Sequence, residues 1–308
     1  MKKNLFKSLK EFGLCYTTKY VWNRMLFKLT KRHKYQDKYF DLVLKYLDKN
    51  YGQVLVNSFD EKTVIPKDYK VWVFWWQGVG DKQPLLVRKC VESIKTNFKN
   101  HEVVVITEEN FQDYMSIPDY ILEKVKNKTI TLTHFSDIIR AILLSEYGGV
   151  YLDATCLLID SIEDEIEGKS FYTNKLQYED DWMHGFVGKA RWSSFFMAGG
   201  GKRNPIFVNL KNVLFEYWKT HNYLIDYFLV DYCIMLSYMK FDNLKKMIDD
   251  VPYNNPNLHK LSPKMLKKFD KNVWNNLEKD TKVFKLSYKM NFENREEDSF
   301  YDYIINKS

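Results

Sequence analysis

Two aspartates and an arginine in the middle of the chain have the residue types and spacing of a binding site. Asp137 and Arg140 are three residues apart, so they share one face if the segment is helical. Asp153 stands at the end of an apolar, strand-like run that follows the same segment. In open α/β sheets, ligands bind beyond the carboxyl ends of the strands, where helix N-termini also point. We therefore expect Asp137 and Asp153 to converge on such a crevice.

A divalent cation would make this site suitable for a diphosphate. Carboxylates and phosphates repel each other unless a hard cation such as Mg²⁺ or Mn²⁺ lies between them. Such a metal would also stabilise a departing diphosphate. Each residue has an ordinary structural explanation as well: Asp137 as a first-turn helix acid, Arg140 as its ion-pair partner, and Asp153 as a turn residue.

The elements that must position these residues begin at about Lys70, where strand and helix patterns alternate as in an α/β sheet. Thr133 is predicted to cap a helix over 134–147, which Gly148 and Gly149 end. Two more helices are predicted over 204–220 and 223–240. The remaining predictions are strands over 71–76, 102–107, 150–153 and 156–159, and helices over 85–98, 108–115 and 118–125. The glycines and cations of 199–203 could form a loop that approaches a phosphate, or a plain solvated turn.

The first 50 residues are predicted to be helical, with Leu5, Leu9, Phe12 and Tyr16 on one face. Residues 1–34 contain ten Lys or Arg residues, and Glu11 is their one acid. A basic amphipathic helix of this kind can lie on an anionic membrane surface, or it can pack against its own domain. We predict a basic helical arm over 1–55 and a single α/β domain over 56–308.

Composition sets the class of protein. The 308 residues carry a net charge of +7, and 45% of them are hydrophobic and 17% aromatic, which excludes intrinsic disorder. No apolar run is long enough to predict a membrane-spanning helix, and the charged start does not have the pattern of a signal peptide. The four cysteines have no zinc-site spacing. These features predict a cytoplasmic protein.

Three strings make the sequence recognisable: VWVFWWQG (71–78), ITEENFQDYMSIPDYI (106–121) and LTHFSDIIRAILLSEYGGVYLDAT (132–155). Together with weaker matches at 195–207, 217–229 and 285–289, they resemble the capsular polysaccharide synthesis glycosyltransferases. These are related to the sugar transferases that carry a DXD motif. The resemblance covers about residues 65–290. It implies a GT-A fold, which is a Rossmann-like nucleotide-sugar-binding sheet, and transfer of a sugar from a nucleotide-diphosphate donor with retention of configuration.

The resemblance also assigns roles to individual residues. It makes Asp137 and Arg140 contacts of the donor sugar, and Asp153 the first acid of the metal motif that would hold Mn²⁺ or Mg²⁺. The second acid is replaced by Thr155, a weaker and neutral ligand, which puts metal dependence in doubt. The other predicted donor-binding residues are Trp75, which would stack on the base or serve as a core aromatic, Gln77, Gly78, and Lys285 and Lys289, which could equally be solvated surface lysines.

Two further acids stand among apolar residues of the 223–240 segment. Asp226 and Asp231 would need a partner or a task on a helix whose neighbours pack inward. We predict that they contact either the acceptor or the metal.

The function predicted from the sequence is glycosyl transfer onto a capsular or exopolysaccharide acceptor, which would be lipid-linked and presented at the inner face of the cell membrane. Two alternatives remain open. The Asp-Ala-Thr string could mark a catalytically silent scaffold of a polysaccharide assembly. The basic arm and the aromatic residues could instead bind nucleic acid, although the chain beyond residue 34 is slightly acidic.

Overall fold

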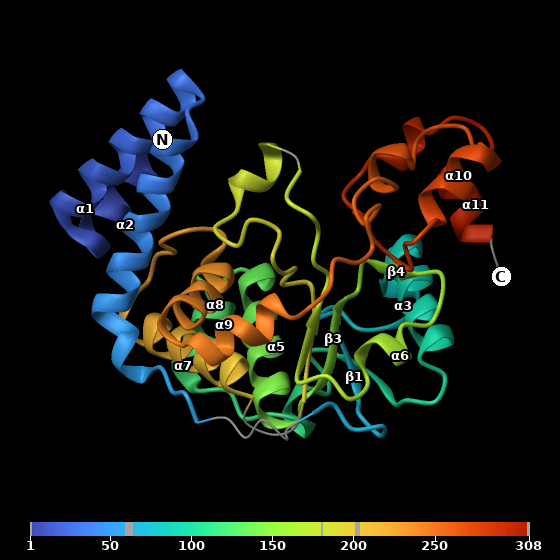
Figure 1. Cartoon of the computed structure of the whole chain (residues 1–308), viewed down its shortest axis with the longest axis horizontal. Coiled ribbons are helices and arrows are strands. Elements are labelled where there is room, and N and C mark those ends of the chain that lie inside the picture. The colour runs from blue at the N-terminus through green and yellow to red at the C-terminus, as the bar shows by residue number, and fades with distance from the viewer. Residues whose placement is uncertain (1, 59–63, 180, 201–203, 307–308) are drawn as a thin grey trace.

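The protein is a mixed α/β structure built around a five-stranded sheet (Figure 1). The computed structural model describes residues 2–58, 64–179, 181–200 and 204–306. The sheet comprises β1 (Val71–Phe74), β2 (Val103–Ile106), β3 (Gly149–Asp153), β5 (Phe171–Thr173) and β6 (Phe196–Gly199). Its strand order is β2-β1-β3-β6-β5, with β1 parallel to β2 and β3, and β6 antiparallel to β3 and β5. The predicted α/β class is confirmed.

Helices cover the sheet on both sides. In Figure 1, α5 (Leu132–Glu146), α7 (Pro205–Thr220) and α8 (Leu229–Lys240) lie on one side of the strands, while α3 (Leu85–Asn97) and α6 (Glu163–Ile166) lie on the other. All four residues of β1 are buried, as expected for a central parallel strand. The other helices are α4 (Asp119–Lys126), α9 (Asp242–Asp249), α10 (Lys271–Glu278) and α11 (Phe300–Asn306).

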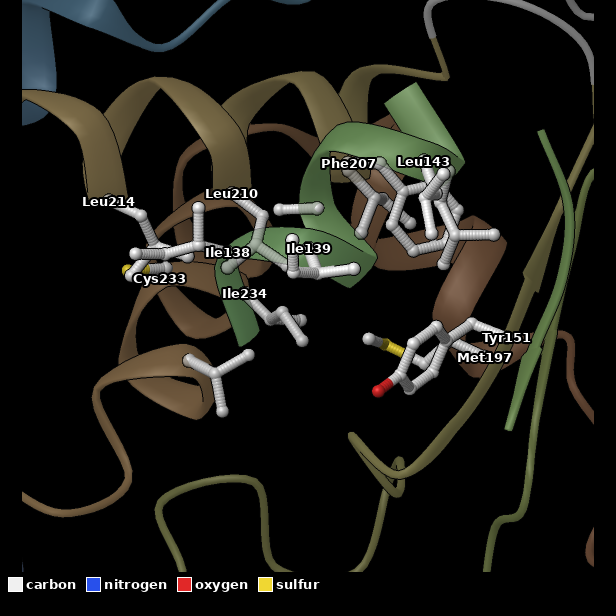
Figure 2. Close-up of a cluster of buried hydrophobic side chains, with 14 of the residues drawn as sticks. Ile138, Ile139, Leu143, Tyr151, Met197, Phe207, Leu210, Leu214, Cys233 and Ile234 are labelled. Carbon is white, nitrogen blue, oxygen red and sulfur yellow. The ribbon is translucent and has the colours of Figure 1, made fainter. Parts of the chain in front are cut away.

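The core that supports the site lies between α5 and its neighbouring helices (Figure 2). Its side chains come from α5, α7 and α8 and face two residues of the sheet; the labelled ones are Ile138, Ile139, Leu143, Phe207, Leu210, Leu214, Cys233 and Ile234, with Tyr151 and Met197 on the strands. Because α5 is buried along almost its whole length, its polar residues are held by packing rather than by solvent.

Two glycines turn the chain from α5 into β3. Gly148 and Gly149 have φ values of 69° and 88°, which L side chains rarely adopt. A Cβ on Gly149 would lie 2.3 Å from the carbonyl oxygen of Lys70, so the close approach of β1 also requires glycine. The Trp72 indole N–H donates to the Gly148 carbonyl at 3.0 Å. These constraints determine the residue at which β3 begins, and Asp153 is the last residue of that strand.

A second, two-stranded sheet joins the C-terminal segment to this region. β4 (Cys156–Leu158) pairs antiparallel with β7 (Val283–Lys285), and Cys156 is opposite Lys285. Behind this ribbon, α10 and α11 pack around a separate cluster of buried residues that includes Trp274 and Phe300. The pairing brings residue 285 beside the turn that links β3 to β4.

The N-terminal 50 residues are helical, as predicted, and form α1 (Lys2–Thr30) and α2 (His33–Tyr51). α2 buries residues such as Val43 and Leu47 in the same core as the sheet. α1 is interrupted at Gly13, whose φ of 78° is not helical, so the predicted face does not run through it. Phe12 and Tyr16 are buried, whereas Leu5 is exposed. In the described part of the chain, no helix is long and apolar enough to span a membrane.

Three predicted elements are wrong in detail, because side chains bond to the backbone locally. The helix predicted to start at Thr133 begins at Leu132, and Thr131 caps it by accepting from the His134 N–H. In 108–115, only Phe111–Asp113 form a 3₁₀ turn, next to the Asn110 carboxamide oxygen that accepts from the Thr107 N–H at 2.8 Å. Such side-chain bonds compete with the helical ladder.

The helix predicted from residue 223 begins at Leu229 for the same reason. The Phe228 N–H donates to the Asp226 carboxylate at 2.8 Å, and the Ile225 N–H donates to the Tyr217 hydroxyl at 2.7 Å. Asp226 is therefore in a loop rather than on a helix, while Asp231 is in the first turn of α8.

Candidate active site

The candidate site lies at the turn where β3 leaves the main sheet. Asp153 ends β3, and Ala154 and Thr155 form the turn into β4. A cleft opens beside this turn and is lined by Trp75 and Gln77 after β1, by residues 132, 133 and 136 at the start of α5, and by Tyr288 after β7. The carboxyl ends of β1 and β3 and the N-terminus of α5 thus meet at one place. Asp153 lines this cleft, whereas Asp137, which was predicted to converge on it, is buried and is not among the described lining residues.

Arg140 joins the two aspartates. Its guanidinium is 3.3 Å from Asp137 and 3.1 Å from Asp153, and its side chain is 4% exposed. The guanidinium also donates to the Ser136 carbonyl and hydroxyl and to the Ser194 carbonyl, and it lies 4.7 Å from the centre of the Tyr151 ring. This many partners hold the guanidinium in one orientation.

Lys285 completes the cluster from the far end of the chain. Its ammonium donates to Asp153 Oδ2 at 2.7 Å and to Thr155 Oγ1 at 2.6 Å, and lies 4.9 Å from the centre of the Phe195 ring. Asp153 therefore has a cation on each oxygen, with Arg140 on Oδ1 and Lys285 on Oδ2.

These pairings determine the charges of the cluster. Burial acts to raise the pKa of Asp153, but the charges of Lys285 and Arg140 outweigh it and hold that pKa below its ordinary value. Burial likewise acts to lower the pKa of Lys285, and the Asp153 carboxylate outweighs it and raises that pKa. Asp153 is thus ionised and Lys285 protonated at neutral pH, so the site presents fixed charges next to the cleft.

The aromatic side of the cleft carries an unused hydrogen-bond donor. Trp75 is 9% exposed, and its indole N–H has no acceptor among the described residues. The Trp75 ring meets Tyr288 edge-on at a centroid distance of 5.2 Å. A buried indole N–H normally has a partner, so this unpaired donor is an unusual feature of the cleft wall.

The structure does not bring every predicted residue to the cleft. Gly78 forms the turn after β1 with a φ of 91°, and Lys289 is exposed beside Tyr288 rather than paired with Asp153. Asp226 is beyond the N-terminus of α8, near Arg24 of α1. For the phosphate loop expected at 199–203, residues 201–203 lie outside the described residues.

Asp231 is buried next to the cluster, and it forms no ion pair with any residue that the structure describes. It accepts from the Trp192 indole N–H at 2.8 Å. Burial raises its pKa to about 7, while the Trp192 hydrogen bond acts to lower it and the Asp137 charge acts to raise it. A carboxyl group with this pKa can hold or release a proton near neutral pH.

Sequence reasoning missed several residues that support the site. Ser136, Phe195 and Tyr288 contact Arg140, Lys285 and Trp75 respectively. Ser136 directly precedes Asp137, and Tyr288 is inside the KLSYK string, so both were within the recognised motifs. Phe195 begins the weaker match at 195–207, but its role depends on the approach of Lys285, which the sequence does not indicate.

Comparison with known families identifies the class of protein. Residues 23–304 match the capsular polysaccharide synthesis protein family, and the chain belongs to that family. The family predicted from the three strings is confirmed.

Individual relatives are distant. The chain is 24% identical over 131 residues to a protein described as "Probable glycosyltransferase FCK3" from Fusarium pseudograminearum (strain CS3096), with 38% of this chain and 32% of that protein covered. The chain thus spans about a third of that relative's length. Among solved structures, "PaToxG Glycosyltransferase" aligns with 75% of this chain and 83% of that chain at 15% identity and a TM-score of 0.38.

Proposed function

We propose that this protein is a glycosyltransferase that moves a sugar from a nucleoside-diphosphate sugar to a capsular or exopolysaccharide acceptor. The observation that carries the proposal is a cleft with an aromatic wall, in which the lining residue Asp153 is paired with Arg140 and Lys285. Membership in the capsular polysaccharide synthesis family and the glycosyltransferase description of the fungal relative support it.

Each part of the cleft has a task in such a transfer. The ring and free N–H of Trp75 suit a nucleobase, which offers both a flat face and hydrogen-bond acceptors. The positively charged side chains of Arg140 and Lys285 suit the diphosphate, whose negative charge grows as it leaves. Asp137, held by Arg140 and by the 3.5 Å approach of His134, suits the hydroxyl groups of the donor sugar. On the basis of the family resemblance, we also propose that the transferred sugar keeps its anomeric configuration.

The acceptor is proposed to enter near the start of α8. Asp231 is buried beside Asp137 and carries a proton at about half occupancy near pH 7. Asp226, whose pKa burial raises to about 6, lies in the preceding loop. We propose that Asp231, which is beside the cluster, accepts a hydrogen bond from an acceptor hydroxyl, and that Asp226 contacts the acceptor farther from the cleft.

A panel of nucleotide sugars tests the proposal. We expect one of UDP-glucose, UDP-galactose, UDP-N-acetylglucosamine or GDP-mannose to raise the melting temperature and to release nucleoside diphosphate. Asp153→Asn should lower the release rate by about 100-fold, because the two cations lose the charge that positions them.

The matched control is Asp160→Asn, an exposed aspartate seven positions further along, which should keep the wild-type rate. If no nucleotide sugar of the panel binds the wild-type protein, the transferase proposal is wrong and a silent scaffold is favoured. Oligonucleotide binding that weakens steeply with salt would favour the nucleic-acid alternative.

We further propose that α1 lies on an anionic membrane surface, where a lipid-linked acceptor is presented. After the break at Gly13, one face of α1 exposes apolar side chains at helical spacing: Leu14, Val21, Trp22, Met25 and Leu29. The opposite face, with Tyr16 and Tyr20, packs inward against α2. Lys19, Lys28, Lys31 and Arg32 are exposed around the apolar face, which suits anionic headgroups.

Vesicle binding tests this surface. Trp22→Glu combined with Leu29→Glu should weaken binding to phosphatidylglycerol vesicles by tenfold or more, since each change removes apolar contact and adds repulsion. Met239→Glu, at an exposed methionine of α8, adds the same type of charge elsewhere and should leave binding unchanged. Equal binding by all three proteins, measured by co-sedimentation, would contradict the membrane role of α1.

A further inference from the structure

The ammonium of Lys285 bridges the two side chains, Asp153 and Thr155, that correspond to the acids of a DXD motif. In such a motif, two carboxylates flank a divalent cation. Here the two flanking groups are the Asp153 carboxylate and the Thr155 hydroxyl, and the Lys285 nitrogen lies between them at 2.7 and 2.6 Å. The antiparallel pairing of β4 with β7 places this lysine, because Cys156 is opposite Lys285 and the Leu286 N–H donates to the Thr155 carbonyl.

This set of donor groups fits a divalent cation poorly. Both oxygens of Asp153 are bonded to cationic side chains, and Thr155 offers a neutral hydroxyl. A hard cation prefers several oxygen ligands, with carboxylates among them. Within the described ranges, no three His, Cys, Asp or Glu residues gather where they could hold a metal ion. A metal at Asp153 would have to displace Lys285 and then lie beside its positive charge.

We propose that the Lys285 ammonium, rather than a divalent cation, neutralises the diphosphate of the donor, so that turnover needs no metal. This inference rests on the proposed function. An ammonium has three N–H donors, and Asp153 and Thr155 accept two of them. The third is left for a phosphoryl oxygen: the Lys285 side chain is 20% exposed, and both of its acceptors, Asp153 and Thr155, line the cleft.

The reaction balances without a metal. The oxygen of the acceptor hydroxyl bonds to the anomeric carbon, and the bond from that carbon to the β-phosphate oxygen breaks. The electron pair of the broken bond stays on the phosphate oxygen, where Lys285 donates its hydrogen bond. The proton of the acceptor hydroxyl passes to the released diphosphate, and Lys285 keeps its own protons throughout. The ammonium thereby supplies the charge stabilisation that a metal would supply.

The first measurement uses the wild-type full chain. We expect UDP or GDP to bind in calorimetry with the same affinity, within about twofold, in EDTA and in Mn²⁺, and we expect the donor of the panel to be turned over in EDTA. Turnover that stops in EDTA and returns with Mn²⁺ would overturn the inference and leave the proposed function standing. Failure of every nucleotide to bind under both conditions would overturn the proposed function, and the inference with it.

Substitutions then remove the lysine and replace it with a pair of carboxylates that can bind a metal. Lys285→Ala should lower turnover by about 100-fold without rescue by Mn²⁺, because one carboxylate and one hydroxyl bind the metal weakly. The double variant Thr155→Asp with Lys285→Ala rebuilds two carboxylates and should recover activity in Mn²⁺ but not in EDTA.

The control is Lys282→Ala, a lysine three positions earlier that pairs with Glu165 at 3.0 Å and should keep wild-type turnover. Circular dichroism checks that each variant folds. If Lys285→Ala is folded and fully active, the lysine is only a structural counter-ion and the proposal is wrong. If that variant does not fold, the wild-type comparison of EDTA with Mn²⁺ decides alone.

Discussion

Asp153, which is part-buried, and Asp231, which is buried, are both carboxyl groups near Arg140, yet their pKa values move in opposite directions. Asp153, at the end of β3, has Arg140 and Lys285 on its two oxygens, and its pKa is lowered. Asp231, in the first turn of α8, has the neutral Trp192 indole as its hydrogen-bond donor, and its pKa rises to about 7. Burial is common to both, so the difference comes from the cations.

This difference separates the tasks that the two groups can perform. A permanently ionised Asp153 can hold Arg140 and Lys285 toward an incoming diphosphate, but it cannot supply a proton near neutral pH. Asp231 can exchange a proton there, but it cannot balance a cation when it is protonated. Paired groups whose environments push their pKa values apart are the usual basis of divided roles in an active site.

Removing Arg140, the cation that Asp137 and Asp153 share, is expected to have the largest effect on stability. Arg140→Ala leaves Asp137 without its arginine and Asp153 with Lys285 alone, in a region where solvent does not replace the lost charge. The free energy of unfolding should fall by about 3–5 kcal/mol. Urea denaturation followed by circular dichroism measures this change.

The matched control is Lys267→Ala, which removes an exposed partner of Glu296 at 3.2 Å. Loss of an exposed pair should cost about 1 kcal/mol or less. If the two variants lose equal stability, the buried cluster is no more important to folding than a surface ion pair, and the contrast between Asp153 and Asp231 has no energetic basis.

A smaller effect is expected from Asp231, and it depends on pH. Because its pKa is about 7 in the folded protein and near 3.8 in the unfolded chain, folding binds a proton between these values. The stability contributed by this group is fully present below about pH 4 and is lost as the pH rises toward 7. The slope is at most about 1.4 kcal/mol per pH unit.

Asp231→Asn should remove this slope, since the amide oxygen can still accept from Trp192 but does not titrate. The measurement is the difference in unfolding free energy between wild type and variant, at pH values from 4 to 8. Asp160→Asn serves as the control and should follow the wild type. A constant difference across this range would show that Asp231 does not hold a proton in the folded state.

Much of the site followed from local sequence. The three-residue spacing of Asp137 and Arg140 and the strand that ends at Asp153 were sufficient to predict that they meet, because helix and strand periodicity are local properties. The two glycines at the junction of α5 and β3 were also recognised in the sequence, and their positive φ values explain why that residue type stands there. Asp226 was not predicted correctly, because its own hydrogen bond to the Phe228 N–H prevents the helix on which it was placed.

The sequence by itself determined the α/β class, the family and the two acids and the arginine that form the cluster beside the cleft. Only the tertiary structure decided how those groups pair and how the pairing shifts their pKa values. Lys285 is 132 positions from Asp153, and no local pattern indicates which of the many lysines reaches it. The antiparallel pairing of β4 and β7 makes that choice. The protonation state of Asp231 likewise depends on which side chains pack around it. Burial favours the neutral form of a carboxyl group unless the fold places cations or hydrogen-bond donors beside it.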